Sequence, residues 1–157
     1  MRIISGKLKG KSISFLKNKR TRPLKDSLKE NIFNILLHSN LFDIKIKNSN
    51  VLDLYSGIGS FGLECISRGA EKITFVEKNN NIAKILKKNL SDLNIKENVN
   101  LVVDSTTNFL VKNFSNKYEI IFLDPPFAVD SYIEDLKIIK QKKNFKKNHV
   151  IIIHREI

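Results

Sequence analysis

From Val51 to the end of the chain, short apolar runs alternate with stretches whose apolar residues recur at helical spacing. The short runs are rich in β-branched residues and are apolar on both faces, which is typical of strands covered by helices on both sides. Strands that alternate with helices predict βαβ units and a parallel sheet. The pattern therefore predicts an α/β fold, with strands over residues 51–55, 72–77, 100–103, 119–124 and 149–154 and helices over residues 59–70, 79–90 and 131–141.

The chain before this core has a different pattern. Residues 1–15 alternate in part and contain glycines at Gly6 and Gly10, which predicts a strand or hairpin. Lys7, Lys9 and Lys11 follow one another at a spacing of two, so a strand would place them on one basic face.

A helix is predicted next, from about Asp26 to Ser39. The run from Ser27 to Glu30 fits a capping box, in which a serine hydroxyl and a glutamate side chain satisfy the first backbone N–H groups. Apolar residues then recur at helical spacing, at Leu28, Ile32, Ile35 and Leu36.

The length of 157 residues allows one packed core and is too short for two ordinary domains. We expect a single domain over residues 1–157, made of an N-terminal extension (residues 1–40) and a Rossmann-like core (residues 50–157). No apolar stretch reaches the roughly 20 residues of a membrane-spanning helix, and the first residues lack the apolar run of a signal peptide, so we expect a cytoplasmic protein. The single cysteine, Cys65, excludes an internal disulfide and a zinc site built on paired cysteines, and we expect no metal.

A formal net charge of +12 and a pI near 9.8 create a field that attracts polyanions. Nucleic acid is the natural partner, although a genome that favours lysine codons would also raise the charge. The position of the charge decides between these interpretations. The lysine-rich run from Lys137 to Lys147 resembles a solvated helix face, whereas a second basic cluster lies outside the core and is the better candidate for RNA contact: Arg2, Lys7, Lys9, Lys11, Arg20 and Arg22.

A glycine-rich turn follows the first core strand, in the sequence Ser56-Gly57-Ile58-Gly59-Ser60-Phe61-Gly62. A turn that leaves a strand and enters a helix lies at the carboxyl edge of a parallel sheet, where ligands bind. Gly57 and Gly59 permit backbone angles and close approaches that a Cβ would block. Taken alone, the turn fits a dinucleotide site as well as an S-adenosylmethionine site.

Acidic residues at the strand ends distinguish these two ligands. Asp53 would repel a pyrophosphate but suits the cationic sulfonium and amino groups of S-adenosylmethionine. Glu77 ends the next strand, where its carboxylate can accept hydrogen bonds from ribose hydroxyls of either cofactor. Asp104 is placed either to accept a bond from the adenine amino group or to cap a helix. We also assign Tyr55, which lies in the same turn, to the cofactor site.

The sequence Asp124-Pro125-Pro126-Phe127 follows another apolar strand and opens at the same edge. An exocyclic base amine is a poor nucleophile, so an enzyme must provide acceptors that bond its N–H groups. Asp124 supplies a carboxylate and Pro125 a carbonyl, and the prolines fix the backbone that carries them. Phe127 can stack on the target base. An ordinary rigid turn is the alternative.

Together these motifs resemble the RsmD family of bacterial 16S ribosomal RNA guanine-N2 methyltransferases. The resemblance covers almost the whole chain, through residues 2–6, 9–11, 22–34, 53–57, 62–70 and the Asp124 motif. It implies a seven-stranded Rossmann-like core, S-adenosylmethionine as donor, a guanine of the small-subunit RNA or of an assembling subunit as acceptor, and a monomer.

Three features depart from the family pattern. Leu24, Lys25 and Ser27 stand where threonines and an arginine are usual, and His154 stands in place of a glutamate. The family continues beyond the position of Ile157 into an antiparallel hairpin, so we expect the last strand to be an apolar sheet edge.

Three alternatives remain open. A DNA adenine-N6 methyltransferase would use the same Asp-Pro-Pro-Phe motif for another exocyclic amine. A nicotinamide-dependent oxidoreductase is disfavoured by Asp53 and by that motif. An inactive RNA-binding remnant would bind the cofactor without transferring a methyl group.

Overall fold

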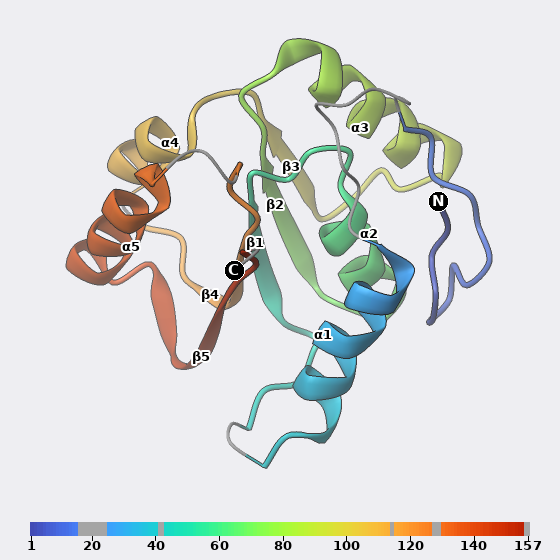
Figure 1. Cartoon of the computed structure of the whole chain (residues 1–157), viewed down its shortest axis with the longest axis horizontal. Helices are drawn as coiled ribbons and strands as arrows, with labels where there is room; N and C mark the ends of the chain where they lie inside the picture. The colour runs from blue at the N-terminus through green and yellow to red at the C-terminus, as the bar shows by residue number, and fades with distance from the viewer. Residues whose placement is uncertain (16–24, 41–42, 114, 127–129, 156–157) are drawn as a thin grey trace.

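Five parallel strands form one sheet in the order β3-β2-β1-β4-β5 (Figure 1). The computed structural model describes residues 1–15, 25–40, 43–113, 115–126 and 130–155. The sheet is the α/β architecture predicted from the alternating pattern. Its strands are β1 (Asn50–Leu54), β2 (Lys72–Val76), β3 (Val99–Val102), β4 (Tyr118–Leu123) and β5 (Phe145–Ile153).

Helices cover both faces of the sheet, because side chains along each strand point alternately to one face and the other. Val51 of β1 belongs to the core on one face, and Leu52 and Leu54 belong to the core on the other. In Figure 1, α1, α2 and α3 lie on one side of the sheet and α4 and α5 on the other. The helices are α1 (Asp26–His38), α2 (Ser60–Ser67), α3 (Asn80–Asp92), α4 (Thr106–Lys112) and α5 (Ser131–Lys142).

Helix α4 was not predicted from the sequence. It has only 7 residues and begins with polar ones, so it gives no clear apolar periodicity. Its start is fixed locally, because the Ser105 side chain accepts a hydrogen bond from Asn108 N at 3.2 Å. Strand β5 begins earlier than predicted, and its pairing with β4 is irregular between Tyr118 and Ile120.

The N-terminal segment folds back on itself, but it is not a regular strand. A single antiparallel bridge joins Arg2 and Ser12, and Lys7 and Lys9 lie in the turn between them. The prediction of three lysines on one strand face is therefore wrong. Ile3 N and Ile13 N donate to Lys11 O and Met1 O across the bridge, whereas Ile4 N and Ser5 N donate to the Glu64 carboxylate of α2.

The N-terminal segment packs tightly against α2. The buried Glu64 carboxylate receives the N–H groups of Ile4 and Ser5 at 2.9 Å each, and Arg68 bonds the same side chain at 3.0 Å. A Cβ at Gly6 would lie 1.9 Å from Ser67 O, so only glycine permits this approach. The predicted extension is thus joined to the core by buried polar contacts.

Helix α1 covers the predicted range but begins differently. Its N-cap is Lys25, which makes no side-chain capping bond, so the capping box at Ser27 is wrong. Asp26 in the first turn pairs instead with Lys29 at 3.4 Å. Lys29 is fully buried, and its ammonium donates to Arg2 O at 2.8 Å. Ile35, one of the predicted apolar positions, is exposed.

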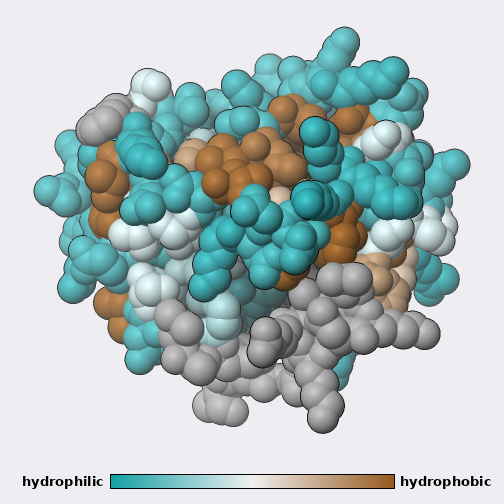
Figure 2. Space-filling view, turned by 90° about the horizontal axis from the view of Figure 1, so that it is seen from above, coloured by the Kyte–Doolittle hydropathy of each residue, from teal (hydrophilic) through white to brown (hydrophobic). Residues whose placement is uncertain are grey.

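Within the described residues, strand β5 lies at one edge of the sheet. Its apolar residues are half-buried, and Ile153 is exposed. Figure 2 shows the molecule from above, that is, from the side toward which β1 ends in Figure 1. On this side, hydrophilic side chains cover most of the surface that is not grey and surround small apolar areas. Within the described part of the chain, no helix is both long and apolar enough to cross a membrane.

Candidate active site at the carboxyl edge of the sheet

The carboxyl ends of β1, β2 and β4 lie level with one another. Leu54, the last residue of β1, pairs with Val76 of β2 and with Leu123 of β4. The residues that follow Val76 and Leu123 are Glu77 and Asp124, so the register brings both carboxylates to the same sheet edge beside Asp53. The predicted convergence of the two ligand-facing loops is confirmed.

The glycine turn is held by its own backbone. Ser56 N donates to Val76 O at 3.0 Å, and Gly59 N donates to Ser56 O at 2.8 Å. Gly59 forms the N-cap of α2 in the left-handed conformation, with φ 86° and no side-chain cap. The turn is therefore attached to the end of β2 as well as to β1.

Asp53 lies inside this turn. It is 1% exposed, and Oδ2 accepts a hydrogen bond from Gly62 N at 3.0 Å. A Cβ at Gly62 would meet the Phe75 ring at 2.3 Å and Asp53 Oδ2 at 3.0 Å, which explains the glycine at that position. Burial raises the pKa of Asp53 from its ordinary 3.8 to about 8, the Gly62 hydrogen bond opposes this, and the nearby Asp124 and Glu77 charges add to it.

Glu77 connects the turn to the end of β2. Oε2 accepts a bond from Gly57 N at 2.9 Å, and Oε1 accepts one from Asn79 N at 2.7 Å. Each carboxylate oxygen has two lone pairs, so each can accept a further bond. Glu77 therefore fixes the position of Gly57 and still has acceptor capacity for a ligand hydroxyl.

The two glycines of the turn have different roles. A Cβ on Gly57 would meet no atom within 4 Å, so the space beside this residue is open. A Cβ on Gly59 would lie 2.3 Å from Leu86 Cδ1 in the core. Gly57 thus borders open space at the turn, whereas Gly59 is required for packing against α3.

Tyr55 has a positive φ of 58°, and its hydroxyl points toward helix α5. It donates to Asp135 Oδ2 at 2.5 Å and lies 3.1 Å from Ser131 Oγ. Burial raises the pKa of Tyr55, and the bond to Asp135 raises it further. The hydroxyl thus links the turn to α5, and only the rest of this half-exposed side chain remains for a cofactor.

The carboxylate of Asp104 is hydrogen-bonded to residues in and just before α4. It accepts bonds from Ser105 N at 2.8 Å, Asn108 Nδ2 at 3.1 Å and Lys112 Nζ at 3.0 Å. The bond from Lys112 is the main reason that its pKa is lowered. Of the two interpretations left open by the sequence, these contacts favour a role at the helix start, although Ser105 and not Asp104 is the N-cap.

Asp124 lies directly beside His154. Asp124 Oδ1 and His154 Nδ1 are 2.7 Å apart, and His154 N donates to Leu123 O at 2.9 Å. Burial raises the pKa of Asp124, while the hydrogen bond and charge of His154 lower it. Pro125 is buried and Pro126 is exposed. Phe127 lies outside the described residues.

The basic residues predicted to contact RNA are placed only in part. Lys7, Lys9 and Lys11 are exposed around the N-terminal turn, and Arg2 is exposed with its Nε 3.6 Å from Asp26. Arg20 and Arg22 lie outside the described residues. The structure therefore leaves four basic side chains exposed on the N-terminal extension.

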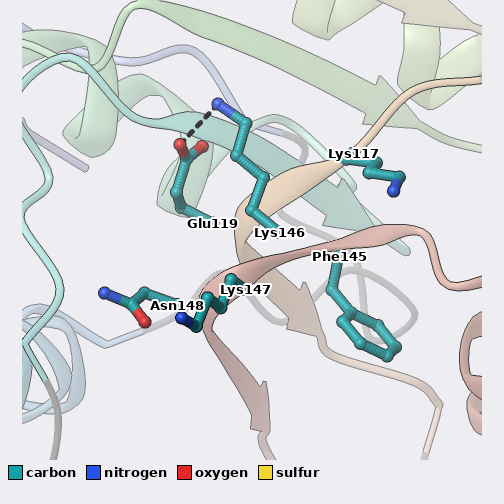
Figure 3. A pocket seen from close by; sticks show the side chains of 6 residues that line it. All are labelled: Lys117, Glu119, Phe145, Lys146, Lys147 and Asn148. Atoms are coloured by element: carbon teal, nitrogen blue, oxygen red, sulfur yellow. Dashed lines mark ion pairs between the residues drawn. The ribbon is translucent and has the colours of Figure 1, made fainter.

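A hollow of about 500 Å³ lies elsewhere on the molecule (Figure 3). Its lining includes Lys117, just before β4, and Phe145, the first residue of β5. The amino ends of parallel strands lie at the edge opposite to Asp124. Figure 3 shows Lys146 directed toward Glu119, with which it forms an ion pair. This hollow is therefore separate from the glycine turn and the Asp124 motif.

Sequence reasoning missed the contacts of two polar residues. In the sequence, His154 stands out only as a departure from the family pattern. The signal for its contact is that it directly follows β5, just as Asp124 directly follows the neighbouring strand β4. Asn89 gave no signal, because one asparagine within an amphipathic helix usually faces solvent. It is 1% exposed and donates to Ile58 O in the glycine turn at 3.2 Å.

The fold and the carboxylates around the glycine turn define a Rossmann-like, S-adenosylmethionine-dependent methyltransferase. The chain belongs to the family described as Conserved hypothetical protein 95, whose model matches residues 1–157. It is 38% identical to Ribosomal RNA small subunit methyltransferase D of Buchnera aphidicola subsp. Acyrthosiphon pisum, over 98% of this chain and 77% of that protein. The protein of the same name from Haemophilus influenzae is 32% identical, over 99% and 79%.

A solved structure supports the same assignment. The Escherichia coli protein yhhF superposes with a TM-score of 0.86 and 27% identity, covering 100% of this chain and 81% of that one. The predictions of a Rossmann-like methyltransferase fold, of S-adenosylmethionine as cofactor and of membership in the RsmD family are confirmed.

Proposed function

We propose that this methyltransferase transfers a methyl group from S-adenosylmethionine to the exocyclic N2 amine of a guanine in 16S ribosomal RNA. One observation carries the proposal: strands β1, β2 and β4 end at the same level of the sheet. This brings Asp53, Glu77 and Asp124 together around one turn. The relatives named as small-subunit ribosomal RNA methyltransferases supply the substrate class.

The residues of the turn fit the cofactor. The open space beside Gly57 accommodates a ligand that approaches the backbone closely. Glu77 has lone pairs for ribose hydroxyls. The buried Asp53 holds Gly62 through Oδ2, and a bound sulfonium cation would favour its ionised form, whereas a pyrophosphate would not. When bound, S-adenosylmethionine supplies an electrophilic methyl group on a cationic sulfur. We include Tyr55 and Gly59 as residues that shape the turn, and Asp104 as a residue at its margin.

In the proposed site, Asp124 and the Pro125 carbonyl accept the N–H groups of the base amine. These acceptors draw the nitrogen toward tetrahedral geometry and release its lone pair from the ring. The nitrogen forms a bond to the methyl carbon as the carbon–sulfur bond breaks, and the bonding electrons stay on sulfur. The Asp124 carboxylate stabilises the positive charge that develops on nitrogen, and the N–H proton that this nitrogen loses passes to solvent water. Pro126 stiffens the loop, and we assign base stacking to Phe127.

The N-terminal extension supplies the proposed RNA contacts, through Arg2, Lys7, Lys9 and Lys11 and, beyond the described residues, Arg20 and Arg22. We propose that the chain acts as a monomer in the cytoplasm, on the small ribosomal subunit or an assembly intermediate. In this arrangement residues 1–40 bind RNA and residues 50–157 carry the cofactor and the reacting groups.

Single-turnover methyl transfer to undermethylated small subunits and to naked 16S RNA, followed by mapping of the modified base, tests the proposal. Asp124→Asn keeps the shape of the side chain but removes its charge, so the rate should fall about 100-fold or more, with cofactor affinity little changed. Asp92→Asn is a matched control on an exposed aspartate at the end of α3. An unchanged rate for Asp124→Asn, or methylation of DNA adenine in preference to RNA, would contradict the proposal.

A further inference from the structure

We propose that His154 is a positioning residue that orients the Asp124 carboxylate and keeps it ionised. This inference rests on the proposed function of Asp124 and adds a residue that the reaction does not touch. His154 Nδ1 lies 2.7 Å from Asp124 Oδ1, which is the distance of a charge-assisted hydrogen bond.

The two side chains meet because the backbone places them at the same level. Leu123 of β4 pairs with Ile153 of β5, and the ladder is extended by the bond from His154 N to Leu123 O at 2.9 Å. Asp124 and His154 are the next residues on these neighbouring strands, so their side chains leave the sheet edge side by side. A regular part of the sheet, and not a loop, therefore fixes the position of the imidazole.

The bond defines which atom of each group is used. When Asp124 is ionised its carboxylate only accepts hydrogen bonds, so in that state Nδ1 of His154 carries the hydrogen and Oδ1 of Asp124 receives it. Oδ2 receives no bond from any other side chain or backbone group that the structure describes. Holding Oδ1 thus orients Oδ2 for the N–H of the base amine.

The same contact opposes the effect of burial. Burial raises the pKa of Asp124, and a protonated carboxyl could not accept the amine N–H or stabilise positive charge on nitrogen. His154 favours the ionised form first by its hydrogen bond and then by its charge. Other charged groups also lie near Asp124: Asp53 at the end of β1, Glu77 at the end of β2, Arg155 beyond β5 and Asp130 at the start of α5.

The test is the pH dependence of single-turnover methyl transfer, with enzyme and cofactor saturating. The wild-type rate should rise with pH until Asp124 is ionised and then level off. His154→Ala leaves burial unopposed, so its rate should be lower by about tenfold or more at pH 6 and approach the wild-type rate at high pH. His154→Asn keeps an N–H donor without the charge and should lie between the two.

His149→Asn is the matched control. His149 lies in the same strand, at the irregular pairing between Phe145 and Val150, where Nδ1 is 2.9 Å from Lys146 O, so its profile should match wild type. The inference would be overturned if the rate of His154→Ala depended on pH in the same way as that of wild type, whether the rate were unchanged or lowered by the same factor at every pH. A merely structural role gives either result.

A second measurement does not depend on activity. A carbon-13 titration of the Asp124 carboxyl should give a higher pKa in His154→Asn than in wild type, and an equal or lower pKa would also overturn the inference. This readout separates the two proposals. If Asp124→Asn transfers methyl groups at the wild-type rate, the proposed function fails, but the titration still determines whether His154 controls the ionisation of Asp124.

Discussion

The side chain of Asn89 and the backbone of Ser14 exchange two hydrogen bonds. Ser14 N donates to Asn89 Oδ1 at 2.8 Å, and Asn89 Nδ2 donates to Ser14 O at 3.1 Å. The same amide nitrogen donates to Ile58 O in the glycine turn at 3.2 Å. One buried side chain of α3 therefore joins the N-terminal extension to the glycine turn.

Asn89→Leu should destabilise the protein strongly. The substitution keeps the approximate volume but leaves three backbone groups without their partner in the interior. At about 0.5–1.5 kcal/mol for each bond, the free energy of unfolding should fall by about 2–4 kcal/mol. Urea unfolding measures this change. Asn81→Leu, on the exposed face of the same helix, should change it by less than about 0.5 kcal/mol. If both substitutions changed the free energy of unfolding equally, the Asn89 hydrogen bonds would not contribute to stability.

Gly57→Ala should weaken cofactor binding and leave the fold intact. The added methyl group enters the open space beside the turn, and a left-handed alanine costs about 1 kcal/mol. Calorimetry should show at least tenfold lower affinity for S-adenosylmethionine.

The control for this substitution is Gly10→Ala. Gly10 also has a positive φ and open space around its Cβ, so it carries the same backbone strain at a distance from the turn. Gly59→Ala is not an equivalent test, because its Cβ would contact Leu86 in the core and should lower the melting temperature. Equal affinities of Gly57→Ala and wild type would exclude the open space from the cofactor site.

The contrast between Gly57 and Gly59 shows where sequence reasoning stopped. Apart from α4, the order of strands and helices was predictable from apolar periodicity. The glycine turn and its position beside Asp124 were also predictable, because the carboxyl ends of parallel strands meet at one sheet edge. The packing partner of each glycine was not predictable, because Leu86 lies on another element. His154 and Asn89 form their contacts across 30 and 75 residues of sequence, and no local pattern reports such contacts.

The capping box at Ser27 and the lysine strand face were wrong for a related reason. Each was based on local spacing, and tertiary contacts determined the outcome. Lys29 is drawn into the interior by Arg2 O and Asp26, so α1 begins at Asp26 without the predicted cap. Lys7 and Lys9 lie in a turn whose neighbours Ile4 and Ser5 donate to Glu64 of α2, so the lysines do not share a strand face.

Asp53 should make the protein less stable as the pH rises. Its pKa is raised from 3.8 to about 8 on folding, so between these values the folded chain binds a proton that the unfolded chain releases. The stabilising contribution is complete below pH 3.8 and is lost as the pH rises through 8. From pH 5 to pH 8 the free energy of unfolding should therefore fall by up to about 4 kcal/mol because of this group.

Urea unfolding at pH 5, 6.5 and 8 measures the effect. Asp53→Asn keeps an oxygen that accepts the Gly62 N–H but does not titrate, so its free energy of unfolding should depend less on pH than that of wild type. Asp43→Asn, on an exposed aspartate, should retain the wild-type slope. Identical slopes for Asp53→Asn and wild type would mean that Asp53 remains charged in the folded protein.

Replacing Lys7, Lys9 and Lys11 together by glutamine should reduce the salt dependence of RNA binding. All three side chains are exposed around the N-terminal turn, which Glu64 and Ser67 hold against α2. Each lysine that neutralises a phosphate releases counterions, so the slope of log affinity against log salt should become shallower by about 2 to 3 units. Filter binding to 16S RNA at several salt concentrations gives the slope.

A second triple variant separates this local effect from the loss of net charge. Lys137, Lys140 and Lys143 are exposed on and just beyond α5, so replacing them by glutamine removes the same charge from the run predicted to be a solvated face. Its slope should stay close to that of wild type. If both triple variants flatten the slope equally, RNA responds to the overall charge of +12 and the N-terminal turn is not a specific contact. If only the α5 variant changes it, RNA binds across α5 instead.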